Sequence, residues 1–342
     1  MQGALVAIEA PGSRPTPFVL GLGIALLSAA SFGSSGTFGS ALMAEGWSPG
    51  AVVTLRILGA ALLLALPTAI AMRGRWHLVR SNVVPILAYG LLAVATCQFA
   101  YFMAVERLSV GVALLLEYLA PVLIVGWMWA RHGRRPTVLT SLGVVSAVVG
   151  LVLVLDVTSG AEIDLLGILW GLLAAIGLVV FFLVAAHETE DSLPPIALAG
   201  GGLTVGAVSL VLATVTGLLP WSASTADVTM GGSPLPWWAA VLELALVAGA
   251  IAYATGIAAA RLLGGTIASF VGLSEVLLAI AFAWVLVGEA MSPIQLFGGL
   301  AILAGVVAVK LGEGEGSAGP PLPADDVDGA VLAEFGTPEE VH

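Results

Sequence analysis

The sequence predicts an all-α membrane protein in which ten transmembrane helices form two inverted five-helix repeats. The first supporting observation is the composition: 59% of the 342 residues are hydrophobic and only 10% are charged, whereas a soluble domain carries about 25% charged residues. The second is a series of long apolar segments, and the third is a sequence repeat. A chain this apolar cannot cover a water-facing surface with polar groups, so lipid is its expected solvent.

Ten apolar segments reach about 20 residues, the length of a helix that crosses the hydrocarbon core of a bilayer. Helices are the expected form because lipid cannot satisfy free backbone hydrogen-bonding groups. Short polar or Pro/Gly-rich links separate the segments. The segments cover residues 18–40, 49–72, 83–105, 109–130, 138–157, 164–186, 194–219, 237–259, 265–287 and 293–310.

The distribution of Lys and Arg predicts the orientation. If the N-terminus is cytoplasmic, the inner segments hold nine basic residues and the outer loops hold only Arg107, as the positive-inside rule favours. The nine are Arg14, Arg73, Arg75, Arg80, Arg131, Arg134, Arg135, Arg261 and Lys310. We therefore expect a multi-pass protein of the plasma membrane with both termini in the cytoplasm. The N-terminal segment lacks the features of a cleaved signal peptide, so the first apolar segment is expected to be retained.

An internal repeat divides the chain into two halves. Residues 104–111 resemble 258–265, and Gly143 and Gly150 match Gly298 and Gly305 one residue later in offset. Each glycine pair is seven residues apart and so lies on one helix face, where small residues allow close helix packing. Because five helices is an odd number, the second half is expected to be inverted, with the substrate site between the halves. The expected units are 1–17, a cytoplasmic N-terminal segment, repeats 18–157 and 158–310, and a tail, 311–342.

The tail accounts for most of the net charge of −11. Eight acidic residues and no Lys or Arg follow Lys310, in a stretch rich in Gly, Pro and Ala. This composition is typical of a disordered, solvated extension. Nothing in the sequence suggests nucleic-acid binding, and a homodimer stays an open possibility.

Four ionisable residues lie well inside apolar segments: Arg56, Glu117, Glu243 and Glu275. Each costs on the order of 2.5–3.5 kcal/mol at a helix centre on insertion scales, so each is expected to face a cavity or a partner. Arg56 and Glu117 both lie roughly 10–12 Å below the outer surface. They either form a coupled site, with Arg56 clamping a carboxylate and Glu117 binding a proton, or a structural pair. Glu243 lies close to Trp237 and Trp238 and is expected to reach towards the outer interface.

Two other features have a structural and a functional interpretation. Pro121 follows Glu117 by one turn and either bends the helix beside a cavity or is a tolerated kink. The small polar run from Ser31 to Thr37 either packs closely or lines a cavity. Cys97 is the one cysteine, so a disulfide within the chain is excluded and a packing role is expected.

Motifs of soluble enzymes are missing. There is no phosphate-binding loop, no dinucleotide glycine fingerprint and no zinc-ligand cluster, and the four histidines lie outside the apolar segments. We therefore expect no catalytic activity, no cofactor and no metal. A non-transport membrane scaffold is the alternative from another class, but a scaffold does not need buried charges.

The chain resembles the drug/metabolite transporter superfamily, in particular its EamA-type members, over about residues 18–310. Gly288-Glu289, Ser292-Pro293-Ile294-Gln295 and Gly298 mark the second repeat. Within that family it looks most like the threonine/homoserine exporters. The similar stretches are Val53-Thr54-Leu55-Arg56, residues 111–118 with Pro121, and Leu273-Ser274-Glu275. It departs from the pattern at the basic loop 131–135, where a Gly-Glu pair is usual, and at Val276, where proline is usual.

The resemblance implies a proton-linked exporter of amino acids or related small metabolites. It assigns substrate binding or coupling to Arg56, Glu117, Tyr118, Pro121 and Glu275. A carrier of another solute class, such as a drug, a sugar or a nucleotide precursor, is the alternative within transport. The expected partners are a small-molecule substrate, protons and the lipid bilayer.

Overall fold

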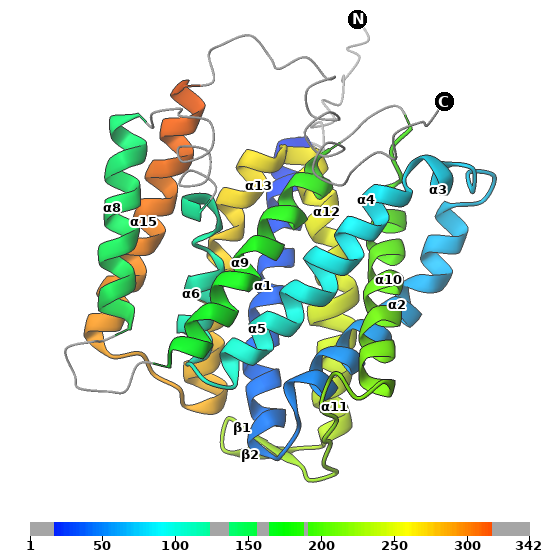
Figure 1. The fold of residues 1–342 in the computed structure, drawn as a ribbon, viewed down its shortest axis with the longest axis horizontal. Helices are drawn as coiled ribbons and strands as arrows, with labels where there is room; N and C mark the ends of the chain where they lie inside the picture. Colours follow the sequence, from blue (N-terminus) through cyan, green and yellow to red (C-terminus); the bar gives the residue numbers. More distant parts are fainter. Residues whose placement is uncertain (1–16, 124–136, 156–163, 188–190, 317–342) are drawn as a thin grey trace, which may run out of the picture.

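The computed structural model describes residues 17–123, 137–155, 164–187 and 191–316 of the chain, and these are almost entirely helical (Figure 1). Among these described residues, eight helical runs are long and apolar enough to cross a membrane. They are Phe18–Ala44, Pro49–Ala71, Val83–Val105, Leu165–Ala185, Pro195–Val215, Trp237–Leu263, Ile267–Val287 and Pro293–Gly312. Val110–Leu123 and Val138–Val154 are shorter apolar helices. The protein is therefore a multi-pass membrane protein.

The first half of the chain contributes seven helices and one π-helical segment to the described part. They are α1 (Pro17–Ala44), α2 (Pro49–Ala71), α3 (Leu78–Ser81), α4 (Val83–Ala88), η1 (Tyr89–Thr96), α5 (Cys97–Val105), α6 (Val110–Glu117) and α8 (Val138–Val154). The η1 segment joins α4 to α5 without a break, so the three form one membrane-spanning run.

The second half begins at α9 and includes two further π-helical segments. Its elements are α9 (Leu165–Ala186), α10 (Pro195–Val215), β1 (Val228–Met230), β2 (Ser233–Leu235), α11 (Trp237–Ala245), η3 (Leu246–Ile251), α12 (Ala252–Leu263), α13 (Gly265–Gly272), α14 (Ser274–Phe282), η4 (Ala283–Val287) and α15 (Pro293–Gly316). The strands form an antiparallel hairpin in which Met230 faces Ser233. Gly231 and Gly232 have φ of 57° and 76° at its two-residue turn, which requires positive φ.

Short polar side chains begin several helices. Ser48, Ser109 and Thr137 accept hydrogen bonds from the backbone N–H groups of Ala51, Val112 and Thr140 at 3.1–3.3 Å. These bonds satisfy donors that have no partner within the helix. Asp164 begins α9 in the same way, at 2.8 Å from the Gly167 nitrogen, and forms an ion pair with Arg107 at 3.2 Å. The Gly167 amide, and then Arg107, hold the pKa of Asp164 below its ordinary value.

The helices α8 and α15 form a closely packed antiparallel pair at one side of the molecule (Figure 1). A Cβ atom on Gly143 would lie 2.6 Å from the Gly305 carbonyl oxygen, and one on Gly150 would lie 2.5 Å from that of Gly298. Only glycine allows the two backbones to come this close. The predicted role of these glycines in helix packing is therefore confirmed.

The observed helices differ from the predicted segments mainly at their ends. The α10 helix ends at Val215, four residues before the expected boundary of 219, and Gly217 follows with φ of 75°. The α15 helix continues past Lys310 to Gly316, since the first prolines of the tail are Pro320 and Pro321. Several predicted features lie outside the described residues. They are residues 1–16, residues 124–130 of the fourth predicted segment, the basic loop 131–135 and the tail from 317.

The N-terminal end of α1 and the C-terminal end of α15 lie on the same face of the molecule. The start of α1 and the end of α15 both lie at the top of Figure 1, and the β1–β2 hairpin lies at the opposite face. The helices α1, α5, α9 and α12 fill the centre, where the Ser28 hydroxyl of α1 donates a hydrogen bond to the Ala252 carbonyl at 2.9 Å. The cavity described in the next subsection lies in this centre.

Candidate functional site

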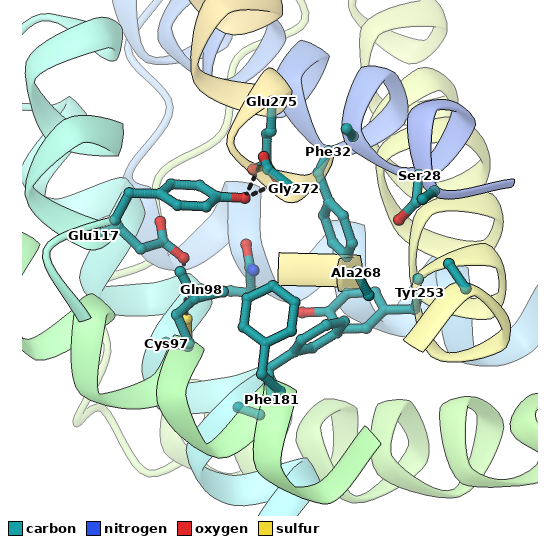
Figure 2. Close-up of a pocket in the computed structure, with 18 residues that line it drawn as sticks. Ser28, Phe32, Cys97, Gln98, Glu117, Phe181, Tyr253, Ala268, Gly272 and Glu275 are labelled. Carbon is teal, nitrogen blue, oxygen red and sulfur yellow. Dashed lines mark hydrogen bonds between the residues drawn. The ribbon is translucent and has the colours of Figure 1, made fainter. Parts of the chain in front are cut away.

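A cavity of about 580 Å³, including its open mouth, lies in the centre of the helices (Figure 2). Its wall comes from α1, the η1–α5 run, the end of α6, α9, α12 and the α13–α14 run. The polar and aromatic residues that line it are Ser28, Phe32, Cys97, Gln98, Glu117, Tyr118, Phe181, Phe182, Tyr253 and Glu275. Three predicted site residues, Glu117, Tyr118 and Glu275, thus meet in one wall.

The two carboxyl groups lie on either side of Tyr118. The Tyr118 hydroxyl lies 2.8 Å from the Gly272 carbonyl oxygen and 2.9 Å from Oε2 of Glu275, so it donates towards both (Figure 2). The Cys97 thiol is 3.5 Å from Oε1 of Glu117 and 3.3 Å from the Ala174 carbonyl oxygen. Glu117 is 6% exposed. A buried carboxyl group with neutral partners can bind a proton or a cation, because its charged form is costly there.

Both carboxyl groups lie at breaks in their helices. The α6 helix ends at Glu117, and helical structure resumes only at Ala120. Pro121 explains this break, since it has no N–H group for the Glu117 carbonyl and its ring would clash with that carbonyl in a continuous helix. The α13 helix ends at Gly272 and α14 begins at Ser274, next to Glu275. Pro121 does not line the cavity, so its role here is to shape the chain beside Glu117.

Another part of the cavity wall is aromatic. The ring centroid of Phe32 is 4.9 Å from that of Tyr253 and 6.0 Å from that of Phe181, in edge-to-face arrangements. Tyr89 lies behind them, 5.7 Å from Phe181. In Figure 2, Phe32 lies between Glu275 and the rings of Phe181 and Tyr253. Such pairs favour a fixed, well-packed wall.

Arg56 lies behind the wall and does not line the cavity. It is 0% exposed, and Nη1 donates to Oε1 of Gln98 while Nη2 donates to the Ala248 carbonyl at 2.6 Å. The guanidinium carbon is 5.7 Å from the Phe102 ring centroid and 6.0 Å from that of Phe32, within cation–π range. Arg56 therefore touches the cavity through Gln98 and Phe32.

The ion pair between Arg56 and Glu117, which their shared depth suggested, is not formed between these two described residues. The neighbouring positions Cys97 and Gln98 of α5 explain why. The Gln98 side chain accepts a hydrogen bond from Arg56, and the Cys97 thiol contacts the Glu117 carboxyl group. Equal depth fixes one coordinate of a side chain but not the direction in which it points.

Glu243 also differs from its expected place. The Ser34 hydroxyl donates to Oε1 of Glu243 at 2.5 Å, and Oε2 is buried without a partner among the described residues. The carboxyl group thus turns to α1 and does not extend to an interface. The polar run from Ser31 to Thr37 mostly packs closely: a Cβ on Gly33 would lie 3.0 Å from the Glu275 carbonyl oxygen. Phe32 is the member of this run that lines the cavity.

The sequence interpretation missed several wall residues. Gln98 and Tyr253 are polar side chains inside apolar segments, a signal that could have identified them. Phe181 and Ser28 carry no such signal, because Phe and Ser are common in membrane helices. Cys97 was assigned to packing, but it also lines the cavity. No group of three His, Cys, Asp or Glu suitable for a metal ion occurs within the described ranges.

Comparisons with known proteins agree with this fold. The sequence matches the EamA-like transporter family over residues 19–156 and 165–311. It is 25% identical over 159 residues to an uncharacterized inner membrane transporter, YicL, of Salmonella typhimurium strain LT2, a match that covers 44% of this chain and 52% of the relative. This chain thus spans about half the length of that relative. A crystal structure of a protein aligns with 90% of this chain and all of its own at a TM-score of 0.54 and 20% identity, which is a likeness of fold. Because the family match covers most of the sequence in two successive parts, the chain belongs to the EamA-like transporter family.

Proposed function

We propose that this protein is a secondary active transporter of the plasma membrane that exports amino acids or related small metabolites in exchange for protons. The resemblance to the threonine/homoserine exporters supports the substrate class. The proposed architecture is ten membrane-crossing helices in two inverted five-helix repeats, with both termini cytoplasmic. In this arrangement, Val110–Leu123 and Val138–Val154 complete the ten.

The observation that carries this proposal is the origin of the cavity wall. If the ten segments are counted in chain order, the wall comes from the first, third and fourth segments of the first half and from the same three of the second. A cavity between equivalent helices of two inverted halves is where a carrier is expected to bind its substrate. Rocking of one half against the other would then open this cavity to each side in turn.

The carboxyl groups provide a route for coupling. Glu117 belongs to the first half and Glu275 to the second, and the hydroxyl of Tyr118, the residue that follows Glu117, donates to Glu275. A proton and a positively charged substrate group would compete for these carboxyl groups, so binding of one promotes release of the other. Arg56 would act on the site through Gln98, and Pro121 through the helix break after Glu117.

The test is transport into proteoliposomes with and without a proton gradient. We expect Glu117→Gln to abolish accumulation driven by the gradient but to retain some downhill exchange, because the amide keeps the shape but cannot exchange a proton. Glu106→Gln is the matched control, since Glu106 is exposed in the loop before α6. A Glu117→Gln protein that still responds fully to the gradient would place coupling elsewhere, with Glu275 as the next candidate.

A further inference from the structure

The cavity has two chemically different parts. Glu117 and Glu275 supply the acidic part, and Phe32, Phe181 and Tyr253 supply the aromatic part, with Phe32 between Glu275 and the other two rings (Figure 2). No Lys, Arg or His is among the described residues that form the wall. A solute bound here would therefore meet both carboxyl groups and aromatic rings.

The acidic part has no cation of its own. Within the described parts of the chain, no Lys, Arg or His nitrogen lies within 4.0 Å of the Glu117 or Glu275 carboxyl oxygens. Their partners are the Cys97 thiol and the Tyr118 hydroxyl. Two cations lie behind the wall: Arg56 donates to Gln98 and the Ala248 carbonyl, and the Lys310 ammonium lies over the rings of Phe182 and Phe270, 6.0 Å and 5.1 Å from their centroids. A carboxylate in an apolar interior must be neutralised by a proton or a bound cation, so a cationic solute group fits this part.

The aromatic part favours an apolar body close to that cation. Phe181 and Tyr253 are 7% and 0% exposed, and their rings form edge-to-face contacts with Phe32. Ring faces attract cations and repel carboxylates, and they also bury apolar surface.

We propose that the cavity selects solutes that join a protonated amine to an apolar body. The ammonium group lies between Glu117 and Glu275, and the body lies against Phe32, Phe181 and Tyr253. When the ammonium ion enters, a carboxyl group that held a proton releases it to the aqueous side, so the charge within the cavity does not change. This inference rests on the proposed transport function and narrows its substrates to apolar amines and apolar amino acids, in preference to threonine or homoserine.

The test uses four solutes that differ in one feature at a time, with the full chain in detergent and in proteoliposomes. Phenethylamine has the amine and the ring, L-phenylalanine adds a carboxylate, 3-phenylpropionate has the ring and carboxylate without the amine, and ethanolamine has the amine without the ring. Binding is measured by calorimetry, and transport by uptake driven by a proton gradient. We expect phenethylamine to bind most tightly, L-phenylalanine next, ethanolamine about tenfold more weakly than phenethylamine, and 3-phenylpropionate not at all.

A variant pair separates the two parts of the cavity. Phe181→Leu keeps an apolar side chain but removes the ring, so it should weaken phenethylamine binding by about tenfold and leave ethanolamine binding unchanged. Glu275→Gln should weaken both. Equal binding of 3-phenylpropionate and phenethylamine by the unaltered protein would overturn the inference whether or not the variants fold. The preference for amines without uptake driven by a gradient would instead overturn the proposed function, and driven uptake without that preference would overturn the inference alone.

Discussion

At the scale of single residues, Arg56 and Glu117 show how a membrane interior holds opposite charges apart. Arg56 has Gln98, the Ala248 carbonyl and two rings around it, and none of these is charged. The apolar interior makes each of these polar contacts stronger than it would be in water. The guanidinium group therefore fixes Gln98, which is itself part of the cavity wall.

The shape of the guanidinium group leads to the first prediction. Arg56→Lys keeps the charge but provides one compact ammonium group, which cannot reach Gln98 and the Ala248 carbonyl in the way that the two terminal nitrogens of Arg56 do. Since a hydrogen bond to a charged group contributes about 1.5–3 kcal/mol, we expect transport to fall roughly tenfold or more. Uptake into proteoliposomes measures this. The control is Arg107→Lys, where the side chain is partly exposed in a loop, and equal uptake by both variants would contradict the role of Arg56.

Tyr118 gives the second prediction, because its hydroxyl group bridges the two halves. Tyr118→Phe keeps the ring but leaves the Gly272 carbonyl and Glu275 without this donor. An unsatisfied buried group costs about 1–3 kcal/mol, so the variant should unfold at a lower temperature and couple transport to the proton gradient less tightly. The ratio of driven to downhill uptake checks the coupling. An unchanged ratio would show that Tyr118 only stabilises the fold.

At the scale of helices, related features recur about 155 positions apart. Tyr118 follows the end of α6, and Leu273 follows the end of α13. The third run of each half contains a π-helical segment, η1 at Tyr89–Thr96 and η3 at Leu246–Ile251. In the repeat, Gly143 corresponds to Gly298 and Gly150 corresponds to Gly305. The contact between Gly143 and Gly305 therefore has the contact between Gly298 and Gly150 as its counterpart. This exchange is expected of an antiparallel pair on a two-fold axis and supports the proposal of inverted repeats.

The close contact of α8 with α15 leads to the third prediction. In Gly150→Ala the new methyl group would lie 2.5 Å from a backbone oxygen on α15, so the helices must move apart. Overpacking of this kind costs about 1–3 kcal/mol. Gly201→Ala is the matched control, since its Cβ would come no closer than 3.5 Å to the Ile86 side chain. Thermal unfolding in detergent should show a clear loss for the first variant and little or none for the second.

The apolar helices could largely be predicted from the sequence, whereas most breaks within them could not. Apolar length identified segments such as 49–72 and 237–259, because lipid permits few other structures. Pro121 is a sequence signal for the turn after Glu117, but apolar length does not locate the break at Leu273 or the π-helical segments, which lie inside the predicted segments. The similar depths of Arg56 and Glu117 predicted that they form a pair. Instead, two residues of α5 contact them separately: Gln98 accepts from Arg56, and the Cys97 thiol contacts Glu117. Such contacts depend on how the helices are rotated about their axes, which packing decides.

At the scale of the whole molecule, the positions of the first and last described helix ends and of the basic residues together predict the orientation. The start of α1 and the end of α15 lie on one face, together with the link between α2 and α4 that contains Arg73, Arg75 and Arg80 (Figure 1). The hairpin β1–β2 lies on the opposite face. If the positive-inside rule decides the orientation, the first face is cytoplasmic and the hairpin is external.

This orientation is the last prediction, and labelling of introduced cysteines tests it. Cys97→Ala removes the one native cysteine, and a cysteine is then placed either at Asp227, before the hairpin, or at His187, after α9, where both side chains are exposed. A thiol reagent that cannot cross membranes should label intact cells at position 227 and not at 187, and permeabilised cells at both. Labelling after solubilisation is the control for reactivity. The reverse pattern in intact cells would show that the whole protein has the opposite orientation.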